Sequence, residues 1–326
     1  MSRKRKLKKH GKFKIFPLIG FILCLLLYFI QEHTDIVNTM WGHSEIISSS
    51  EQESTEQASS SIEKEVTAEG EMKVTFIDIG QGDATLIQTE EQCMLIDTGS
   101  SSEKEALLTV LDSCQVTYID FLVLTHPDED HIGNGNTIME TYSVGAVLYP
   151  EVESDTKAWS ITLNAINNSD AVVEHPMEGD IYYIGDAVAE IITPNTITDT
   201  TTKNNASIGM KLTHGSKSFI LCGDAEEEAE NKMVSANIYL EADVLKCSHH
   251  GSATATTQAF LDRINPVYAI ISCGANNKYG HPHAEVLARL EDDDVQIYRT
   301  DLQGSITAIS DGNNIRISSE SNKEEN

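Results

Sequence analysis

The sequence predicts one α/β domain of four layers, in which two β-sheets lie face to face and helices cover both outer faces. Two observations predict this arrangement. Short apolar runs typical of strands open both halves of residues 72–320, and each group of strands is followed by segments with helical spacing of apolar residues. A region of this length can also bury one well-packed core.

The expected elements follow the periodicity of the apolar residues. In the first half, continuous or alternating apolar runs predict strands at residues 72–78, 84–89, 93–97, 121–124, 144–149 and 187–193. In the second half, similar runs predict strands at residues 208–212, 219–222, 244–247, 268–272, 297–299, 305–309 and 315–318. Apolar residues three and four positions apart predict helices at residues 103–111, 154–168, 226–235, 256–264 and 284–290.

Four shorter segments flank this domain. Residues 1–14 form a basic cytoplasmic flank, and the apolar residues 15–30 predict a transmembrane signal anchor. Residues 31–71 are rich in Ser and Glu and predict a flexible linker, while residues 321–326 form a tail. Because the basic flank should stay in the cytoplasm, we expect a single-pass protein of the cell membrane with its main domain outside. Cleavage of the anchor would make that domain a secreted one.

The charge of the chain restricts its partners. With 23 basic and 51 acidic residues, the formal charge is −28, and eight of the basic residues lie in the N-terminal flank. The remainder carries 15 basic against 51 acidic residues, a formal charge of −36. Such a surface repels polyanions. Any activity on nucleic acid would therefore depend on bound cations and a few local basic residues.

Residues 125–133 are the most informative segment. Four potential metal ligands lie there within six residues, directly after an apolar run that predicts a buried strand: His126, Asp128, Asp130 and His131. A solvated acidic turn would account for the aspartates, but not for two interleaved histidines at a strand end. This spacing predicts a metal site on the loop where the strand ends and a helix begins.

A second set of candidate ligands follows three later strands. Asp224 follows the strand at 219–222, His249 and His250 follow the strand at 244–247, and His281 lies in the loop after the strand at 268–272. Strand ends that meet at one edge of a sheet bring their side chains together. We therefore expect these residues to complete the metal site. Cys247, two positions before His249, is a weaker candidate for a soft ligand.

The order of the motifs resembles a known family. The strings FIDIGQGDATLI, LIDTG, LVLTHPDEDHIGN, NNASIGMKL, ILCGD, ADVLKCSHHGS, AIISCGANNKYGHP and YRTDLQGSI occur in this order over about residues 72–318. They resemble the metallo-β-lactamase fold and, within it, the hydrolase domain of the ComEC competence proteins. The resemblance implies an αββα sandwich. With one apolar span in the chain, we expect a detached hydrolase domain on its own anchor.

The resemblance also implies a set of metal ligands. Carried over residue by residue, His126 and Asp128 would bind one divalent ion. Asp130 and His131 would bind the second, and Asp224 would bridge the two. The implied cofactor is therefore a pair of divalent ions.

Three positions qualify this ligand set. His249 matches the last ligand of the fold and leaves His250 as an outer or substrate contact, but the order of the two can be reversed. Asp128 and Asn205 stand where the wider fold has histidine. Both changes make the first site richer in oxygen, which favours Mn²⁺ or Mg²⁺ relative to Zn²⁺. Two Mn²⁺ or Zn²⁺ ions are expected, and Mg²⁺ is also compatible.

The expected mechanism is attack on phosphorus by a metal-activated hydroxide. Asp130 would position the hydroxide as well as bind metal. His281 would donate a proton to the leaving oxygen, and Lys278 would supply a positive charge for the phosphate. Four polar residues at strand exits are expected to orient the ligands: Asp78, Gln81, Asp83 and Asp97.

The function that follows is a metal-dependent phosphodiesterase, most simply a nuclease acting on DNA outside the membrane. One alternative is a surface hydrolase of a non-nucleic phosphodiester or a lactone, which the acidic charge favours. Another is a non-catalytic member that binds metal, which the substituted first site favours. The expected partners are DNA or another phosphodiester substrate and the membrane, which the N-terminal anchor would contact; the sequence does not identify any protein partner.

Overall fold

The computed structural model describes residues 70–236 and 238–323. The predicted basic flank and signal anchor, nearly all of the predicted linker and the last three residues lie outside these ranges. Within the described ranges, every helix falls short of the length and apolarity that a membrane span needs.

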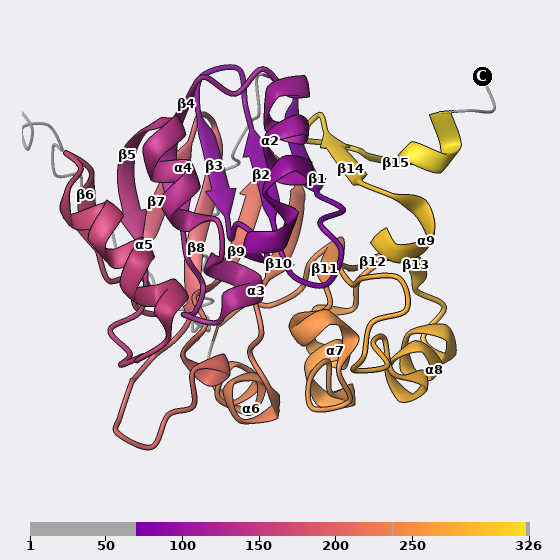
Figure 1. Ribbon diagram of the computed structural model, residues 1–326. Helices are drawn as coiled ribbons and strands as arrows, with labels where there is room; N and C mark the ends of the chain where they lie inside the picture. The colour runs from indigo at the N-terminus through magenta and orange to yellow at the C-terminus, as the bar shows by residue number, and fades with distance from the viewer. Residues whose placement is uncertain (1–69, 237, 324–326) are drawn as a thin grey trace, which may run out of the picture. The chain divides into compact units, whose positions relative to one another are not determined.

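The first sheet has eight strands in the order β15-β14-β1-β2-β3-β4-β5-β6 (Figure 1). Neighbouring strands are antiparallel from β15 to β3 and parallel from β3 to β6. Their bounds are β1 Met72–Phe76, β2 Thr85–Gln88, β3 Cys93–Ile96, β4 Tyr118–Val123, β5 Ser143–Leu148, β6 Val172–Glu174, β14 Ile306–Ser310 and β15 Ile315–Ser319.

The second sheet has seven strands in the order β13-β12-β11-β10-β9-β8-β7. Strands β10 to β13 are parallel, whereas β7 to β10 are antiparallel. Their bounds are β7 Ile181–Ile184, β8 Ala187–Thr193, β9 Gly209–His214, β10 Lys217–Leu221, β11 Val244–Lys246, β12 Tyr268–Ile271 and β13 Gln296–Arg299.

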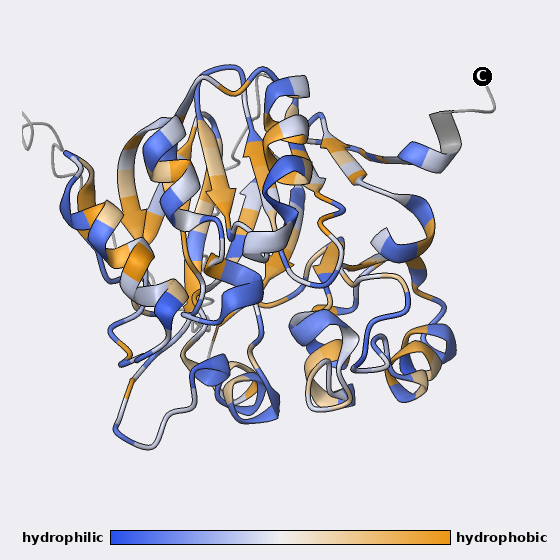
Figure 2. Ribbon diagram, in the orientation of Figure 1, coloured by the Kyte–Doolittle hydropathy of each residue, from blue (hydrophilic) through white to orange (hydrophobic). Residues whose placement is uncertain are grey.

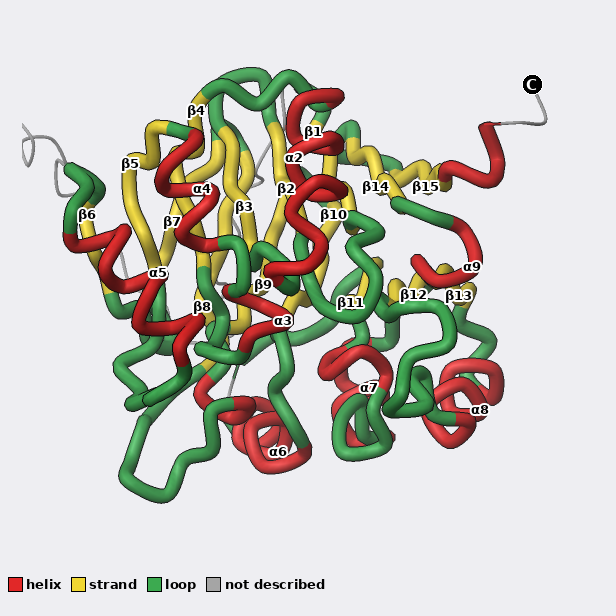
Figure 3. The backbone as a smooth tube through the Cα atoms, in the orientation of Figure 1, coloured by secondary structure: helices red, strands yellow, loops and turns green. Residues whose placement is uncertain are grey.

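Helices cover the outer faces of both sheets (Figure 3). The first sheet packs against α2 Lys104–Ser113, α4 Gly135–Thr141 and α5 Lys157–Asn167. The second packs against α6 Glu227–Ser235, α7 Gln258–Ile264 and α8 Ala284–Asp292. Two helices are single turns: α3 Glu129–Ile132 follows β4 after a loop of five residues, and α9 Thr300–Gln303 follows β13 directly.

Three apolar clusters hold these layers together. The central one lies between the sheets and joins side chains from both, among them Phe76 of β1 and Phe219 of β10. The second lies under α2, α4 and α5, and the third under α6, α7 and α8. Figure 2 shows the matching distribution, with hydrophobic residues along the strands and hydrophilic ones on the outer faces of the helices. The predicted four-layer arrangement is confirmed.

The sequence analysis missed four elements: the strands β6 and β7, the helix α4, and the single-turn helix α9, whose four residues are too few for a helical pattern. The edge strand β6 is three residues long and largely exposed, and in β7 the side chain of Tyr183 is 62% exposed. Such strands bury no regular face, so they leave no period-two pattern in the sequence. Helix α4 was missed because its seven residues form barely two turns.

Candidate metal centre

The ends of parallel strands build the centre at one edge of the sandwich. Asp97 follows β3, and His126 lies three residues beyond the end of β4, which pairs with β3 in parallel. In the second sheet, Asp224 lies after β10, and His250 lies after its parallel neighbour β11. Because parallel strands end at the same edge, segments far apart in the chain bring these side chains together.

Asp224 lies at the middle of the centre. Its Oδ1 lies 3.1 Å from Nε2 of His131. Its Oδ2 lies 3.8 Å from Nε2 of His126, 3.7 Å from Nε2 of His250 and 3.8 Å from Nε2 of His249. Burial alone would raise the pKa of Asp224, but the surrounding imidazoles, above all His131 and His250, hold it well below its usual range. The carboxylate therefore stays ionised.

The residues present fit a divalent metal. Ligand atoms of His126, His131 and Asp224 lie within 4.8 Å of one another, and so do those of Asp130, His131 and His250. Nε2 of His126 is buried and makes no hydrogen bond within the described structure, which costs free energy unless a ligand satisfies it. Burial, with the charge of His131, lowers the pKa of His126 to about 3. Its imidazole is therefore neutral and keeps a lone pair for a metal.

Asp97, which the sequence predicts to orient a ligand, contacts His131. Its Oδ2 accepts a 2.7 Å hydrogen bond from Nδ1 of His131, which turns Nε2 towards Asp224. The carboxylate also accepts bonds from the backbone N–H of Thr125, at 2.8 Å, and from its hydroxyl, at 2.7 Å. Burial alone would lower the pKa of His131, but the carboxylates of Asp224 and Asp97 raise it well above its ordinary value.

Of the two adjacent histidines, the geometry favours His250 as the ligand. Both lie in the single-turn 3₁₀ helix η3 Ser248–Gly251 and have left-handed backbones, with φ of 50° and 56°. His250 is buried, with Nε2 3.5 Å from Oδ2 of Asp130. His249 lies at the rim, where its Nδ1 is 3.3 Å from Oε1 of Glu226 and 3.1 Å from Oγ1 of Thr254. This is the reversed order that the sequence left open.

The two positions that depart from the wider fold behave differently. Asp128 reaches the centre, with Oδ2 3.8 Å from Nε2 of His126 and Oδ1 3.4 Å from Nζ of Lys203. Asn205, in the 3₁₀ helix η2 Asn204–Ala206, uses its Oδ1 to accept backbone hydrogen bonds from the first turn of α6. Its role is therefore that of a helix cap.

Three contributing residues escaped the sequence analysis: Lys203, Ser207 and Lys246. Oγ of Ser207 lies 3.4 Å from Nδ1 of His126 and accepts a bond from the backbone N–H of Asp224. Lys246, the last residue of β11, is buried and forms an ion pair with Asp83. For Lys246, the sequence did contain a signal: a lysine at the end of a predicted buried strand, just before the loop with the candidate ligands, indicates a buried ion pair.

The loop after β1 supports the centre through its backbone. The N–H of Asp83 donates to the carbonyl oxygen of Asp130 at 3.0 Å. Gly82 permits this approach, since a Cβ there would lie 2.4 Å from the same oxygen. Asp78 and Gln81 shape the loop: Oδ1 of Asp78 accepts from the N–H of Gly80, and Oε1 of Gln81 accepts from the N–H of Gly274. Burial raises the pKa of Asp78.

The loop after β12 brings His281 close to both His249 and His250. The ring of His281 is centred 5.6 Å from that of His249 and 6.1 Å from that of His250. Burial and the charge of His250 lower the pKa of His281 to about 4, so the ring is neutral at pH 7. That disfavours the predicted role of proton donor. Nζ of Lys278 lies 4.9 Å from the ring centroid of Tyr279, within the same loop.

Cys247 is not a good ligand. Its side chain is buried, and burial raises the pKa of its thiol to about 12. The thiolate that a metal needs is therefore scarce at neutral pH.

Comparisons with known proteins agree on the family of this domain. The family model described as the metallo-beta-lactamase superfamily matches residues 77–275. ComE operon protein 3 of Bacillus subtilis is 34% identical over 259 residues, which cover 74% of this chain and 33% of that protein. Recombination protein 2 of Haemophilus influenzae is 32% identical over 238 residues, covering 72% of this chain and 28% of that protein.

A third relative is competence protein ComA of Neisseria gonorrhoeae, which is 28% identical over 247 residues. The match covers 74% of this chain and 33% of that protein. The chain thus spans about a third of the length of the curated relatives it matches.

Replacing Asp97 should weaken metal binding. Asp97→Asn keeps the size of the side chain but removes the anionic acceptor that orients His131, so affinity for Mn²⁺ or Zn²⁺ should fall about 10-fold to 100-fold. Competition with a chromophoric chelator measures this. The matched control is Asp311→Asn, in the exposed turn between β14 and β15, which should leave affinity unchanged. Equal affinities for all three proteins would contradict the role of Asp97.

Metal binding should also release a proton near neutral pH. Because the pKa of His131 lies well above 6.5 in the metal-free protein, its ring is protonated at pH 7 and must lose a proton to bind metal. Apparent affinity should therefore rise as pH is raised above about 6.5. Calorimetry in two buffers of different ionisation enthalpy counts the released protons. Heats that are the same in both buffers would show that His131 is already neutral.

Proposed function

Since this chain belongs to the metallo-beta-lactamase superfamily, we propose that it is a metal-dependent phosphodiesterase that acts on DNA or another phosphodiester. The superfamily and the sequence resemblance to competence proteins are established by the family match and by the relatives. The observation that carries the proposal is the convergence of carboxylates and imidazoles around Asp224, in a chain whose relatives include a recombination protein and a competence protein.

The candidate ligands form two groups, and His131 lies close enough to belong to either of them. In the proposal, His126, His131 and Asp224 hold one divalent ion, with Asp128 beside them, and Asp130 and His250 serve a second ion. Divalent ions held there would lower the pKa of an attacking water and neutralise charge on the phosphoryl oxygens. Mn²⁺ and Zn²⁺ are the preferred ions, because the donor set mixes carboxylates and imidazoles.

Asp130 is the residue proposed to position the attacking water. Burial would raise its pKa, but the hydrogen bond with His250 and the charge of His131 lower it to about 2. The carboxylate is therefore ionised at neutral pH and can accept a hydrogen bond from water. The contact between Oδ2 of Asp130 and Nε2 of His250, at 3.5 Å, holds the carboxylate towards the centre.

Two further residues are proposed to contact the phosphate. Lys203 lies beside Asp128 at the edge of the centre and carries the positive charge that a phosphate needs. His281 is neutral at pH 7, so it donates a hydrogen bond through its ring N–H and does not supply a positive charge. The proton for the leaving oxygen then comes from a water at the open side of the centre. Lys278 lies in the same loop as His281, with its Nζ near the ring of Tyr279, and its predicted role beside the phosphate stays a prediction.

A second candidate function is hydrolysis of a non-nucleic phosphodiester or a lactone. The observation in its favour is the formal charge of −28, which opposes tight binding of an extended polyanion. Activity on a simple aryl phosphodiester, with no cleavage of DNA at low ionic strength, would favour this function.

We place the domain outside the cell membrane, held by residues 15–30. The support is the apolar character of this segment and the eight basic residues that precede it. Externally added protease should therefore degrade the domain in intact cells while a cytoplasmic marker survives. Protection of the domain until the cells are lysed would overturn this placement.

Substitution of Asp130 tests the catalytic proposal. The full-length protein with Mn²⁺ should cleave single-stranded DNA, and Asp130→Ala should lower kcat at least 100-fold, because the water loses its anionic acceptor. Asp112→Ala removes an exposed carboxylate of α2, away from the centre, and serves as the control for lost negative charge; it should leave kcat within twofold. Absence of cleavage of any phosphodiester with Mn²⁺, Zn²⁺ or Mg²⁺ would refute the proposal.

A further inference from the structure

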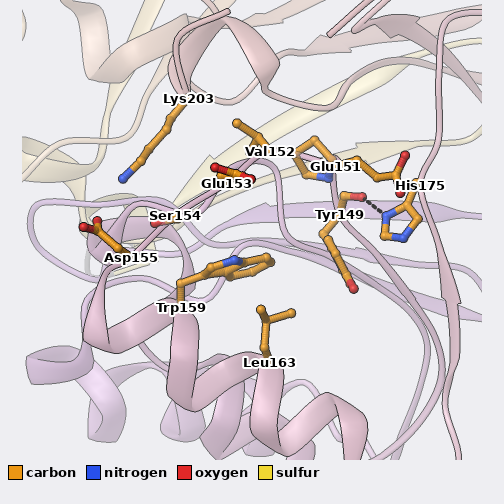
Figure 4. Close-up of a pocket in the computed structure, with 11 residues that line it drawn as sticks. Tyr149, Glu151, Val152, Glu153, Ser154, Asp155, Trp159, Leu163, His175 and Lys203 are labelled. Atoms are coloured by element: carbon orange, nitrogen blue, oxygen red, sulfur yellow. Dashed lines mark hydrogen bonds between the residues drawn. The ribbon is translucent and has the colours of Figure 1, made fainter. Parts of the chain in front are cut away.

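An open cleft of about 810 Å³ has Lys203, the ion-pair partner of Asp128, in its lining. It is formed by the loop between β5 and α5, the first half of α5, and His175 next to β6 (Figure 4). A cleft of this volume is large enough for one small organic ligand, such as a nucleoside.

The floor of the cleft is aromatic and apolar. Tyr149 packs edge to face on Trp159, with ring centroids 5.2 Å apart, and on His175, with centroids 4.6 Å apart. His175 is fixed by a 2.8 Å hydrogen bond from its Nδ1 to the carbonyl oxygen of Tyr149, drawn as a dashed line in Figure 4. Leu163 completes the floor. Trp159 is buried beneath this floor, and the exposed ring of His175 offers a face on which a planar ligand can pack.

The rim of the cleft is acidic. Glu151, Glu153 and Asp155 are all exposed along the loop that borders it. These carboxylates would repel a phosphate, but they accept hydrogen bonds from amines and hydroxyls. These features favour a ligand group that carries no negative charge, is planar in part and offers hydrogen-bond donors.

Lys203 connects the cleft to the metal centre. It is the only lysine or arginine among the described residues that line the cleft, and its Nζ lies 3.4 Å from Oδ1 of Asp128. A cation at this junction marks the place for a single phosphate, between the acidic rim and the imidazoles of the centre.

From this arrangement we propose that the cleft binds the nucleoside of a phosphodiester substrate, with the attached phosphate at Lys203 and the scissile bond at the metal centre. This inference rests on the proposed phosphodiesterase function and adds a substrate class to it. The acidic rim allows one nucleoside to enter but opposes further phosphates beyond it. The preferred substrates are therefore short nucleotides or the end of a strand.

Binding can be measured without catalysis, because the chain has two tryptophans, at positions 41 and 159. In full-length Trp41→Phe, Trp159 is the remaining tryptophan, and excitation at the long-wavelength edge of tryptophan absorption, where tyrosine absorbs little, selects it. Titration with adenosine, which carries no phosphate, should change its fluorescence in a saturable way. His175→Ala in the same background should weaken this binding about fivefold or more, as expected for a lost stacking partner. Tyr183→Ala removes another exposed aromatic residue and should leave binding unchanged.

Kinetics provide the second measurement. With a dinucleoside monophosphate as substrate, His175→Ala should raise KM about fivefold or more while kcat changes less than twofold, and Tyr183→Ala should change neither. Absence of any adenosine response, saturable binding of N-acetylglucosamine in preference to adenosine, or an unchanged KM in His175→Ala would overturn the assignment of the cleft. Adenosine binding without cleavage of any phosphodiester would instead refute the proposed function and leave the cleft assignment standing.

Discussion

The centre depends on the contacts between the buried carboxylate of Asp224 and the imidazoles around it. Four imidazoles place a ring nitrogen within 3.1 to 3.8 Å of its two oxygens, and they come from both sheets of the sandwich. Without this anion, the histidines would be packed in a poorly solvated space with no counter-charge. Separating a buried charge from its partners costs free energy of folding. The contacts of Asp224 therefore hold the loops after β4, β10 and β11 in fixed positions relative to one another.

Several buried charges offset one another behind the ligands. Burial alone would lower the pKa of Lys246, but Asp83 and the nearby Asp224 raise it, so the lysine remains a cation beneath the centre. Asp97 is completely buried, and its bonds to His131 and Thr125 satisfy it. Buried polar groups hold one another in a single arrangement when their hydrogen-bond donors and acceptors have partners. The rigid sandwich supplies the positions, and the network fixes the orientation of the ligands.

The backbone stores strain where the ligands leave the strands. Asp97, His249 and His250 have positive φ, a conformation that costs about 1 to 3 kcal/mol for each residue other than glycine. Consecutive left-handed residues after β11 form the tight turn that directs His250 inwards and leaves His249 at the rim. Packing of the strands on both sides of the turn maintains this conformation. Lys203, which lines the neighbouring cleft, lies next to Asp128 of the same centre.

The sequence by itself determined the strands with buried faces, the four layers, and the clustering of His126, Asp128, Asp130 and His131, because these features depend on short-range patterns. Only the tertiary structure decided which of His249 and His250 faces the centre, since a left-handed turn breaks the alternation that sequence reasoning assumes. It also decided the pairing of Lys246 with Asp83 and the capping role of Asn205. Both contacts join segments that are distant in the chain and meet at the same edge of the sandwich. No local sequence pattern shows which distant segments will meet.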